Sequence, residues 1–419
     1  MEETLEFWFD FSCPYAFIAS TRVEAVAERT GATLVPRPIL LGGLFRAIGQ
    51  PTDVSASLGA AKARYNALDV QRQARLWDVP LTFPKGHPLR TVTPLRALLA
   101  AGEPRMDLIH RFYRAYWIEG VDISTDAGTA RVLGEAGLDA DALLAKARTD
   151  AIKDALRQRT DEAVARGVFG VPTFGTGKHI QFGQDRLAVV EAALGGNPPS
   201  LAEAVGAGET EGAPLSPVDF WFDYSSPFSA IAAARAEAAF GDALRMRPML
   251  LGGVFRDVGM DNLPMQAMSP PKRVWAGHDM ARQARDARMP FRWPSRFPMR
   301  TILPLRMTLA AGPDTAEGRA LIRAFYRAYW CDDRNIGEAD EASAIASEAG
   351  LDGPALVQAT AAPEIKEQLI ANGSEAVAAG VFGAPTFVVH HADGERSLYW
   401  GNDRLELALL AARGDRRAR

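Results

Sequence analysis

The stretch FDFSCPYAFIAS, residues 9–20, returns as FDYSSPFSAIAA, residues 222–233. Alternating apolar residues before each stretch predict a β-strand, and a proline followed by a run of small apolar residues predicts the first turn of a helix. The chain therefore contains the same strand-to-helix junction twice. The residue before the proline differs between the copies, being Cys13 in the first and Ser226 in the second.

Further blocks repeat in the same order along the chain. They are LLGGLFR (40–46) and LLGGVFR (250–256), FYRAYW (112–117 and 325–330), GVFGVPTF (167–174) and GVFGAPTF (380–387), and FGQDRL (182–187) and WGNDRL (400–405). Blocks that keep their order over two hundred residues indicate a duplicated domain rather than a short solenoid repeat.

The duplication predicts a first domain over residues 1–205 and a second over 218–412. Between them, residues 206–217 form a segment rich in Gly, Pro and acidic residues, which is typical of an exposed linker. The last residues, 413–419, read as a frayed basic tail.

Within one copy, the order of patterns predicts an α/β domain. A strand, a helix and a second strand, parallel by the βαβ rule, are followed by a largely helical stretch from about 45 to 166. That stretch ends at Gly167, and the chain then enters a strand through Pro172, a hairpin and a last helix. This is a thioredoxin-like layout with an inserted helical domain.

Composition excludes several classes of function. The net charge is −4, which favours neither nucleic acid nor an anionic membrane as a partner. The acidic start of the chain does not resemble a signal peptide, and no apolar run approaches the roughly 20 residues that span a bilayer. Two cysteines and six scattered histidines predict neither a disulfide framework nor a metal site. We therefore expect a cytoplasmic protein.

The residue before each helix-starting proline is the first candidate for chemistry. Free N–H groups and the helix dipole favour an anion there, so the thiol of Cys13 would be shifted toward thiolate, whereas Ser226 would donate a hydrogen bond to another molecule's thiolate. The alternative is that Cys13 is a small buried apolar residue and Ser226 is a helix N-cap.

The loops at Pro172 and Pro385 are the second candidate. If these bonds were cis, the backbone of Val171 or Ala384 would face the helix start and could pair with a peptide. Otherwise each proline simply begins an edge strand.

Together these blocks resemble 2-hydroxychromene-2-carboxylate isomerase, a family close to kappa-class glutathione transferases in the DsbA-like branch of the thioredoxin superfamily. The resemblance rests on D-x-x-[S/C]-P-[Y/F], R-P-x-L-L-G-G-x-F-R, [F/H]-P-x-R-T-x-x-P-L-R, G-V-F-G-x-P-T-F and [F/W]-G-x-D-R-L, and covers nearly all of both copies. It implies two DsbA-like thioredoxin domains, each with a helical insertion.

The resemblance also implies glutathione as the cofactor. The family's serine before the proline holds the glutathione thiolate; Ser226 matches it and Cys13 departs from it. Pairing with the glutathione backbone is implied for Val171 and Ala384, and binding of the γ-glutamyl end for four residues of the G-x-D-R-L segments. Those four are Gln184, Asp185, Asn402 and Asp403, whose alternative role is helix N-capping.

Two arginine positions depart from the family pattern in both copies. Arg46 and Arg256 stand where the family has lysine, and Arg90 and Arg300 stand where it has asparagine. An arginine can bind a carboxylate of the substrate or the glycine end of glutathione bidentately. The alternative is a solvated side chain, and the departure puts the family's usual substrate in doubt.

The sequence thus predicts a glutathione-dependent isomerase. It would carry out cis–trans isomerisation of an aromatic-derived unsaturated 2-oxo acid by reversible thiolate addition, with Ser226 and Arg256 as the main catalytic residues. The alternatives are a thiol oxidoreductase or glutathione transferase using Cys13, and a glutathione- or peptide-binding module without turnover. We expect the halves to pack as a pseudo-dimer, with a homo-oligomer possible, and YRAYW and Cys331 to serve as packing residues.

Overall fold

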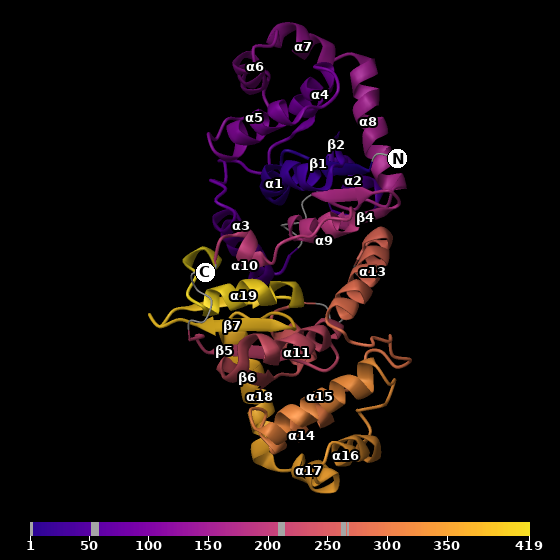
Figure 1. Ribbon diagram of the computed structural model, residues 1–419, viewed down its shortest axis with the longest axis vertical. Coiled ribbons are helices and arrows are strands. Elements are labelled where there is room, and N and C mark those ends of the chain that lie inside the picture. The colour runs from indigo at the N-terminus through magenta and orange to yellow at the C-terminus, as the bar shows by residue number, and fades with distance from the viewer. Residues whose placement is uncertain (1–2, 52–57, 208–213, 261–264, 266–267) are drawn as a thin grey trace. The chain divides into compact units, whose positions relative to one another are not determined.

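The computed structural model describes residues 3–51, 58–207, 214–260, 265 and 268–419. The chain forms two compact units, which we describe separately (Figure 1). Unit 1 comprises Met1–Leu58, Asn66–Ser200 and Ala267–Trp275, and unit 2 comprises Gly59–Tyr65, Leu201–Gln266 and Ala276–Arg419. The units follow the two sequence copies except for the short segments 59–65 and 267–275.

Each unit contains a four-stranded mixed sheet. In unit 1 the order is β2-β1-β3-β4, where β1 pairs with β2 in parallel and with β3 antiparallel, and β3 pairs antiparallel with β4. The strands are β1 (Thr4–Phe9), β2 (Thr33–Pro38), β3 (Thr173–Thr176) and β4 (His179–Phe182). The predicted parallel βαβ unit and the later hairpin are both present.

Helices enclose this sheet and form the insertion. Helix α1 (Pro14–Thr30) connects the parallel strands, and a helical stretch lies between β2 and β3, as predicted. Its members are α2 (Leu41–Ala47), α3 (Ala60–Leu76), α4 (Val92–Ala100), α5 (Met106–Trp117), α6 (Asp126–Glu135), α7 (Ala140–Ala147) and α8 (Asp150–Ala165). After β4 come the 3₁₀ turn η1 (Gln184–Arg186) and α9 (Leu187–Ala193).

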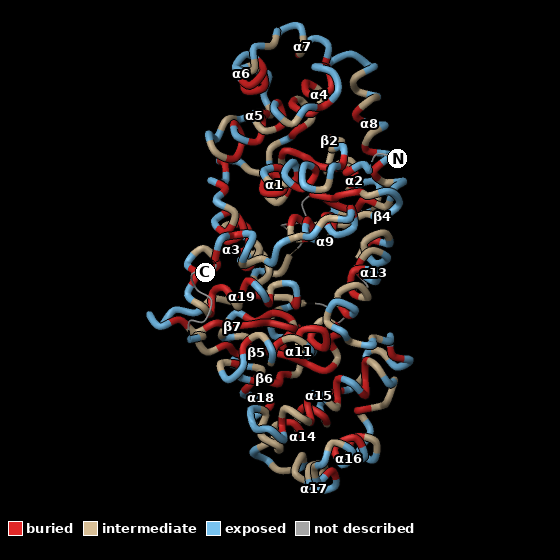
Figure 2. The backbone as a smooth tube through the Cα atoms, in the orientation of Figure 1, coloured by how far each residue is buried: buried red, intermediate tan, exposed pale blue. Residues whose placement is uncertain are grey.

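Unit 2 repeats the arrangement with sheet order β6-β5-β7-β8. Its strands are β5 (Val218–Phe222), β6 (Leu244–Pro248), β7 (Thr386–His390) and β8 (Arg396–Trp400). Its helices are α10 (Leu201–Ala204), α11 (Pro227–Phe240), α12 (Leu251–Asp257), α13 (Pro270–Asp286), α14 (Ile302–Ala311), α15 (Ala316–Trp330), α16 (Ala339–Glu348), α17 (Gly353–Ala359), α18 (Pro363–Ala378) and α19 (Leu405–Ala412), and its 3₁₀ turns are η3 (Gly241–Ala243), η4 (Asn402–Arg404) and η5 (Arg416–Ala418). In Figure 2, β5 and β7 are marked as buried.

The repeated YRAYW segments pack in the core and fasten the helical insertion to the sheet. Trp117 and Trp330 are fully buried, as predicted for packing residues. The Trp117 indole donates to the Phe11 carbonyl at 2.9 Å, and the Trp330 indole donates to the Tyr224 carbonyl at 2.8 Å. Each tryptophan therefore holds the loop between the first strand of its unit and the following helix.

The end of the chain is ordered, so the expectation of a frayed tail is wrong. Ala418 is buried, and its carbonyl accepts from the Tyr399 hydroxyl at 2.8 Å. Arg417 pairs with Asp415 and donates to the Val205 carbonyl. Within the predicted linker, residues 208–213 lie outside the described residues.

None of the described helices is long and apolar enough to cross a membrane. Among the described residues, no group of three or more His, Cys, Asp or Glu side chains is arranged to hold a metal ion.

Candidate functional site

In unit 2, Ser226 connects the start of α11 to the loop before β7. Its hydroxyl oxygen accepts a hydrogen bond from the Ser229 amide at 3.1 Å, which makes Ser226 a helix N-cap. The same hydroxyl donates to the Ala384 carbonyl at 2.9 Å. The helix start and the proline loop, which are 158 residues apart in the sequence, therefore meet through this one side chain.

In unit 1, Cys13 occupies the equivalent place but makes a different set of contacts. Its sulfur donates to the Val171 carbonyl at 3.1 Å. Cys13 makes no side-chain cap at the start of α1. In both halves the start of the helix therefore lies against the proline loop. The Ser226 hydroxyl caps its helix and bonds to the loop, whereas the Cys13 thiol bonds to the loop without capping its helix.

The thiol of Cys13 is not shifted toward thiolate, contrary to the sequence-based expectation. Burial raises its pKa to about 12, and the nearby carboxyl of Asp10 adds to the rise. The backbone amides of Ala16 and Tyr15 at the helix start lower the pKa, but burial outweighs them. The loss of water around the sulfur decides the protonation state, because burial disfavours the charged form.

Both proline loops contain a cis peptide bond, at Val171–Pro172 and at Ala384–Pro385. The carbonyls of Val171 and Ala384 accept from the helix start of their own unit, as described above. Within the described parts of the chain, the amides of Val171 and Ala384 make no hydrogen bond. Each loop therefore offers a backbone donor of the kind that an added extended peptide uses.

A buried aspartate sits just before each helix start. The Asp10 carboxylate accepts from the Ser12 amide and hydroxyl, the Leu41 amide and the Thr91 hydroxyl, at distances of 2.7–2.9 Å. It joins β1, the N-terminus of α2 and the residue before α4. Burial raises the pKa of Asp10, against these hydrogen bonds.

Asp223 makes the matching contacts in unit 2. It accepts from the amides of Ser225 and Leu251 at 2.9 and 2.8 Å and from the Thr301 side chain. Burial likewise raises its pKa. From the sequence, the repeated aspartate was visible only as the first position of the D-x-x-[S/C]-P-[Y/F] motif. The available signal was a charged residue at the end of an apolar strand in both copies.

The aspartates of the G-x-D-R-L segments fold back over the preceding glycine. A Cβ atom at Gly183, where φ is 105°, would lie 2.6 Å from an Asp185 carboxylate oxygen, and at Gly401, where φ is 110°, 2.5 Å from Asp403. Only glycine fits there. Asp185 pairs with Arg186 at 3.0 Å, whereas the corresponding pair in unit 2 is longer, at 3.6 Å.

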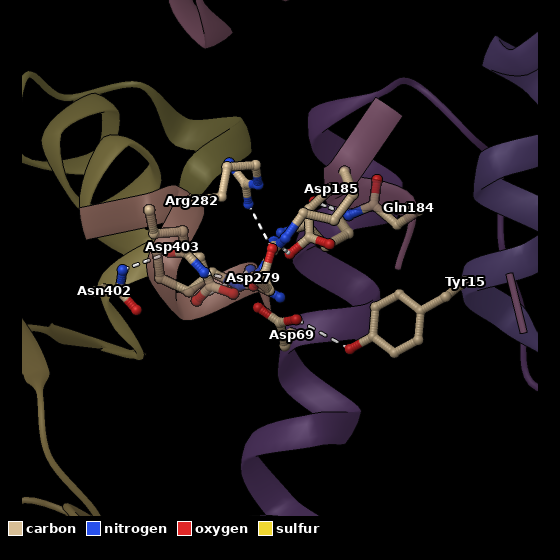
Figure 3. Close-up of polar contacts among 12 residues, drawn as sticks. Tyr15, Asp69, Gln184, Asp185, Asp279, Arg282, Asn402 and Asp403 are labelled. Atoms are coloured by element: carbon tan, nitrogen blue, oxygen red, sulfur yellow. Dashed lines mark hydrogen bonds and ion pairs between the residues drawn. The ribbon is translucent and has the colours of Figure 1, made fainter. Parts of the chain in front are cut away.

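The amide side chains next to these aspartates point into the protein. Gln184 is buried and donates to Gln73 at 2.9 Å, and Asn402 is buried and donates to Gln283 at 2.5 Å. Figure 3 shows both amides, together with the neighbouring contact from Tyr15 to Asp69 in unit 1. The side chains of Gln184 and Asn402 therefore support their loops from behind.

All four arginines proposed as substrate or glutathione ligands are exposed, which fits the solvated alternative. Arg256 pairs with its neighbour Asp257 at 2.8 Å, with 78% of its side chain exposed. Among the described residues, the side chains of Arg46, Arg90 and Arg300 make no hydrogen bond or ion pair. None of the four contacts the residues around Cys13 or Ser226 in the described structure. The adjacent threonines, Thr91 and Thr301, bond to the buried aspartates instead.

The comparison with known families agrees with the duplicated architecture. The DsbA-like thioredoxin domain matches twice, over residues 4–195 and 217–411. The chain belongs to the DsbA-like thioredoxin domain family. As predicted from its repeats, it contains two such domains, each with a mixed four-stranded sheet and helices.

Relatives of this chain each correspond to about one half of it. It is 30% identical over 195 residues to 2-hydroxychromene-2-carboxylate isomerase of Sphingobium xenophagum, covering 46% of this chain and 99% of the relative. It is 27% identical over 210 residues to glutathione S-transferase kappa 1 of Rattus norvegicus, covering 46% and 90%. A solved 2-hydroxychromene-2-carboxylate isomerase is 28% identical with a TM-score of 0.43, covering 46% of this chain and 94% of the other.

Proposed function

We propose that this chain is a glutathione-dependent isomerase and that its second half carries the turnover. The observation that carries the proposal is the position of the Ser226 hydroxyl, which lies at the first turn of α11 and 2.9 Å from the Ala384 carbonyl. The relatives named as isomerases and kappa-class transferases support the coarser assignment to glutathione-related chemistry.

The residues around Ser226 suit a thiol tripeptide. The Ala384 amide is an available backbone donor, so the loop can pair with an extended peptide. When bound, glutathione would supply a thiolate that adds reversibly to a conjugated double bond of an unsaturated 2-oxo acid. Asp403, at the start of η4, is the proposed partner for the ammonium of the γ-glutamyl end.

Ser226 would act by redirecting one hydrogen bond. Its oxygen keeps the bond from the Ser229 amide, so the hydroxyl proton can turn from the Ala384 carbonyl to a sulfur anion without leaving the cap unmade. Donors already oriented toward a developing charge stabilise it strongly, because they need no reorganisation. Arg256, exposed and paired only to its neighbour in sequence, is the proposed ligand of the substrate carboxylate.

Use of Cys13 as a redox nucleophile has less support. Burial raises the pKa of its thiol to about 12, and the thiolate is the reactive form in disulfide exchange. The sequence CPYA, residues 13–16, lacks a second cysteine that could resolve a mixed disulfide.

The test compares Ser226→Ala with Cys13→Ala in the full chain. Isomerisation of an unsaturated 2-oxo acid is followed by ultraviolet absorbance with and without glutathione. We expect Ser226→Ala to lower kcat by about 10²-fold or more, and Cys13→Ala to leave it near the wild-type value. Ser225→Ala is the matched control, because that serine lies one residue from the site and its amide and side chain bond to Asp223 rather than to the Ala384 loop. Full activity in Ser226→Ala would reject the proposal.

A further inference from the structure

A second difference between the halves lies behind the G-x-D-R-L loops. Arg22 of α1 and Arg235 of α11 are the same residue in the two copies, nine positions after Cys13 and Ser226. Their side chains take different directions. Arg22 bonds to Gln184 of its loop, and Arg235 bonds to Glu406 in the first turn of α19.

In unit 1, Arg22 is built into the support of the loop. Its guanidinium lies 3.3 Å from the centre of the Trp77 ring. It donates to the Gln184 side-chain oxygen at 2.8 Å and to the Gln184 carbonyl at 3.3 Å. Burial lowers the pKa of Arg22 to about 9 and the carboxylate of Asp185 opposes that shift, so the guanidinium is positively charged at neutral pH.

In unit 2, the equivalent loop has no such cation from α11. Arg235 instead donates to Glu406 on α19 at 2.8 Å, in an exposed pair. Asn402 is supported by Gln283, whose amide in turn donates to the carboxylate of Asp279 at 2.5 Å. Arg282 also contacts Asp279 (Figure 3). Asp279 corresponds to Asp69 of unit 1, so this carboxylate is common to both halves and the arginine of the first helix is the difference.

Two residue differences between the copies explain why Arg22 and Arg235 have different partners. Trp77, which stacks on Arg22, corresponds to Ala287, and Glu406, which attracts Arg235, corresponds to Ala188. An arginine stacks well on an aromatic face and pairs well with a carboxylate, so each half offers its arginine one good partner and not the other.

We propose that Arg22 sets the ligand preference of the first half, which takes a thiol acid or peptide without a free N-terminal ammonium, while the second half takes glutathione. The inference rests on the proposed function, in which this loop holds the γ-glutamyl end. That end carries an ammonium and a carboxylate. The positive charge of Arg22 interacts with Asp185 and weakens the attraction of the Asp185 carboxylate for a ligand's ammonium. The same charge still favours a carboxylate on the ligand.

The experiment measures ligand binding to each half separately in one sample of the full chain. The protein is labelled with 5-fluorotryptophan, and the ¹⁹F resonances of Trp77 and Trp400, which report on units 1 and 2, are assigned by single Trp→Phe variants. Glutathione and glutaryl-cysteinylglycine, which lacks only the α-amino group, are titrated separately. We expect glutathione to bind about tenfold more tightly at the Trp400 site than at the Trp77 site, and the analogue to lose this difference.

The variants assign the effect to Arg22. Arg22→Met should tighten glutathione binding in the first half by about tenfold, whereas Arg22→Lys, which keeps the charge, should not. Arg235→Met is the matched control and should change neither site. A thermal melt of each variant checks that unit 1 remains folded.

The outcomes separate this inference from the proposed function. If glutathione binds both halves equally in the wild type, or Arg22→Met leaves the first site unchanged, the inference is wrong and the proposed function stands. If neither resonance responds to glutathione in any variant, the proposed function itself is wrong.

Discussion

The two halves share one framework and differ in the groups placed on it. Both join a helix start to a cis-proline loop, and both anchor that junction with a buried aspartate. The first half places the Cys13 thiol at the junction and a half-buried arginine behind the neighbouring loop, and the second half places Ser226 there and pairs its arginine with Glu406. A duplicated fold can thus keep its geometry while its chemistry changes at a few side chains.

The largest expected contrast concerns the reactivity of Cys13. At pH 8 a thiol with a pKa of about 12 is ionised in roughly one molecule in ten thousand, so native Cys13 should react with iodoacetamide about a thousandfold more slowly than in urea-unfolded protein. The rate should keep rising above pH 10, because the raised pKa delays ionisation. Mass spectrometry of the Cys13 peptide measures it. Rapid labelling that is already constant near pH 7 would contradict the raised pKa of this half-buried thiol.

Replacing Ser226 by the cysteine of the first half tests whether the Ser226 hydroxyl is needed for turnover. Ser226→Cys should lower glutathione-dependent kcat by about 10²-fold, because a thiol is a weaker and longer hydrogen-bond donor than a hydroxyl. The reverse change, Cys13→Ser, should add little activity while Arg22 remains in place. Steady-state kinetics on both variants checks this. Equal activity of Ser226→Cys and wild type would remove the distinction between the halves.

The buried aspartates should behave alike in both halves. Asp10→Asn and Asp223→Asn should each lower the free energy of unfolding of their unit by about 1–3 kcal/mol at pH 7, because an amide cannot accept all the donors that converge there. Urea denaturation of each variant measures the change. A loss confined to one half would show that the shared framework is not equivalent.

The pH dependence of that loss has a definite sign. Burial raises the native pKa of Asp10 and Asp223 above the ordinary carboxyl value of 3.8. The stability that follows from a raised pKa is fully present below the unfolded pKa and is lost as pH rises through the native pKa. The difference between wild type and each Asn variant should therefore decrease as pH rises from about 4 and then become constant.

The smallest contrast is between two ion pairs on the last helices. Arg235–Glu406 is exposed, so Glu406→Gln should change the free energy of unfolding by no more than about 0.5 kcal/mol. In the first half, Glu191 is buried and receives two hydrogen bonds from Arg29, so Glu191→Gln should have a larger effect. Urea denaturation at low and high salt compares the two. An equal loss would show that burial does not distinguish them.

Much of the framework was accessible from the sequence. The repeated strand-to-helix junction and the proline loops were each visible as local patterns, and their repetition reduced the number of possible layouts. The approach of the Val171 loop to Cys13 and of the Ala384 loop to Ser226 was predicted for cis bonds at Pro172 and Pro385, and both bonds are cis. The roles of these residues in binding remain predictions.

Other features depended on packing that no local pattern records. Residue type and spacing give no exposure, so the sequence did not reveal that all four candidate arginines are exposed; their role as ligands stays a prediction. The thiol of Cys13 was expected to ionise because a helix start favours anions, whereas its pKa depends on how much water reaches the sulfur. The tail was expected to fray because it is basic, yet Ala418 is buried against unit 2.

By itself, the sequence determined that the chain is a duplicated α/β protein whose copies differ at residues 13 and 226, because hydrophobic periodicity and repeated turn residues are local properties. Only the tertiary structure decided which side chains are charged, buried or directed at a partner. Arg22, Trp77 and Gln184 are far apart along the chain, and their contact exists only because α1, the end of α3 and η1 meet within one unit. Desolvation and pairing are properties of such contacts, so the difference in chemistry between the two halves becomes visible only in the folded chain.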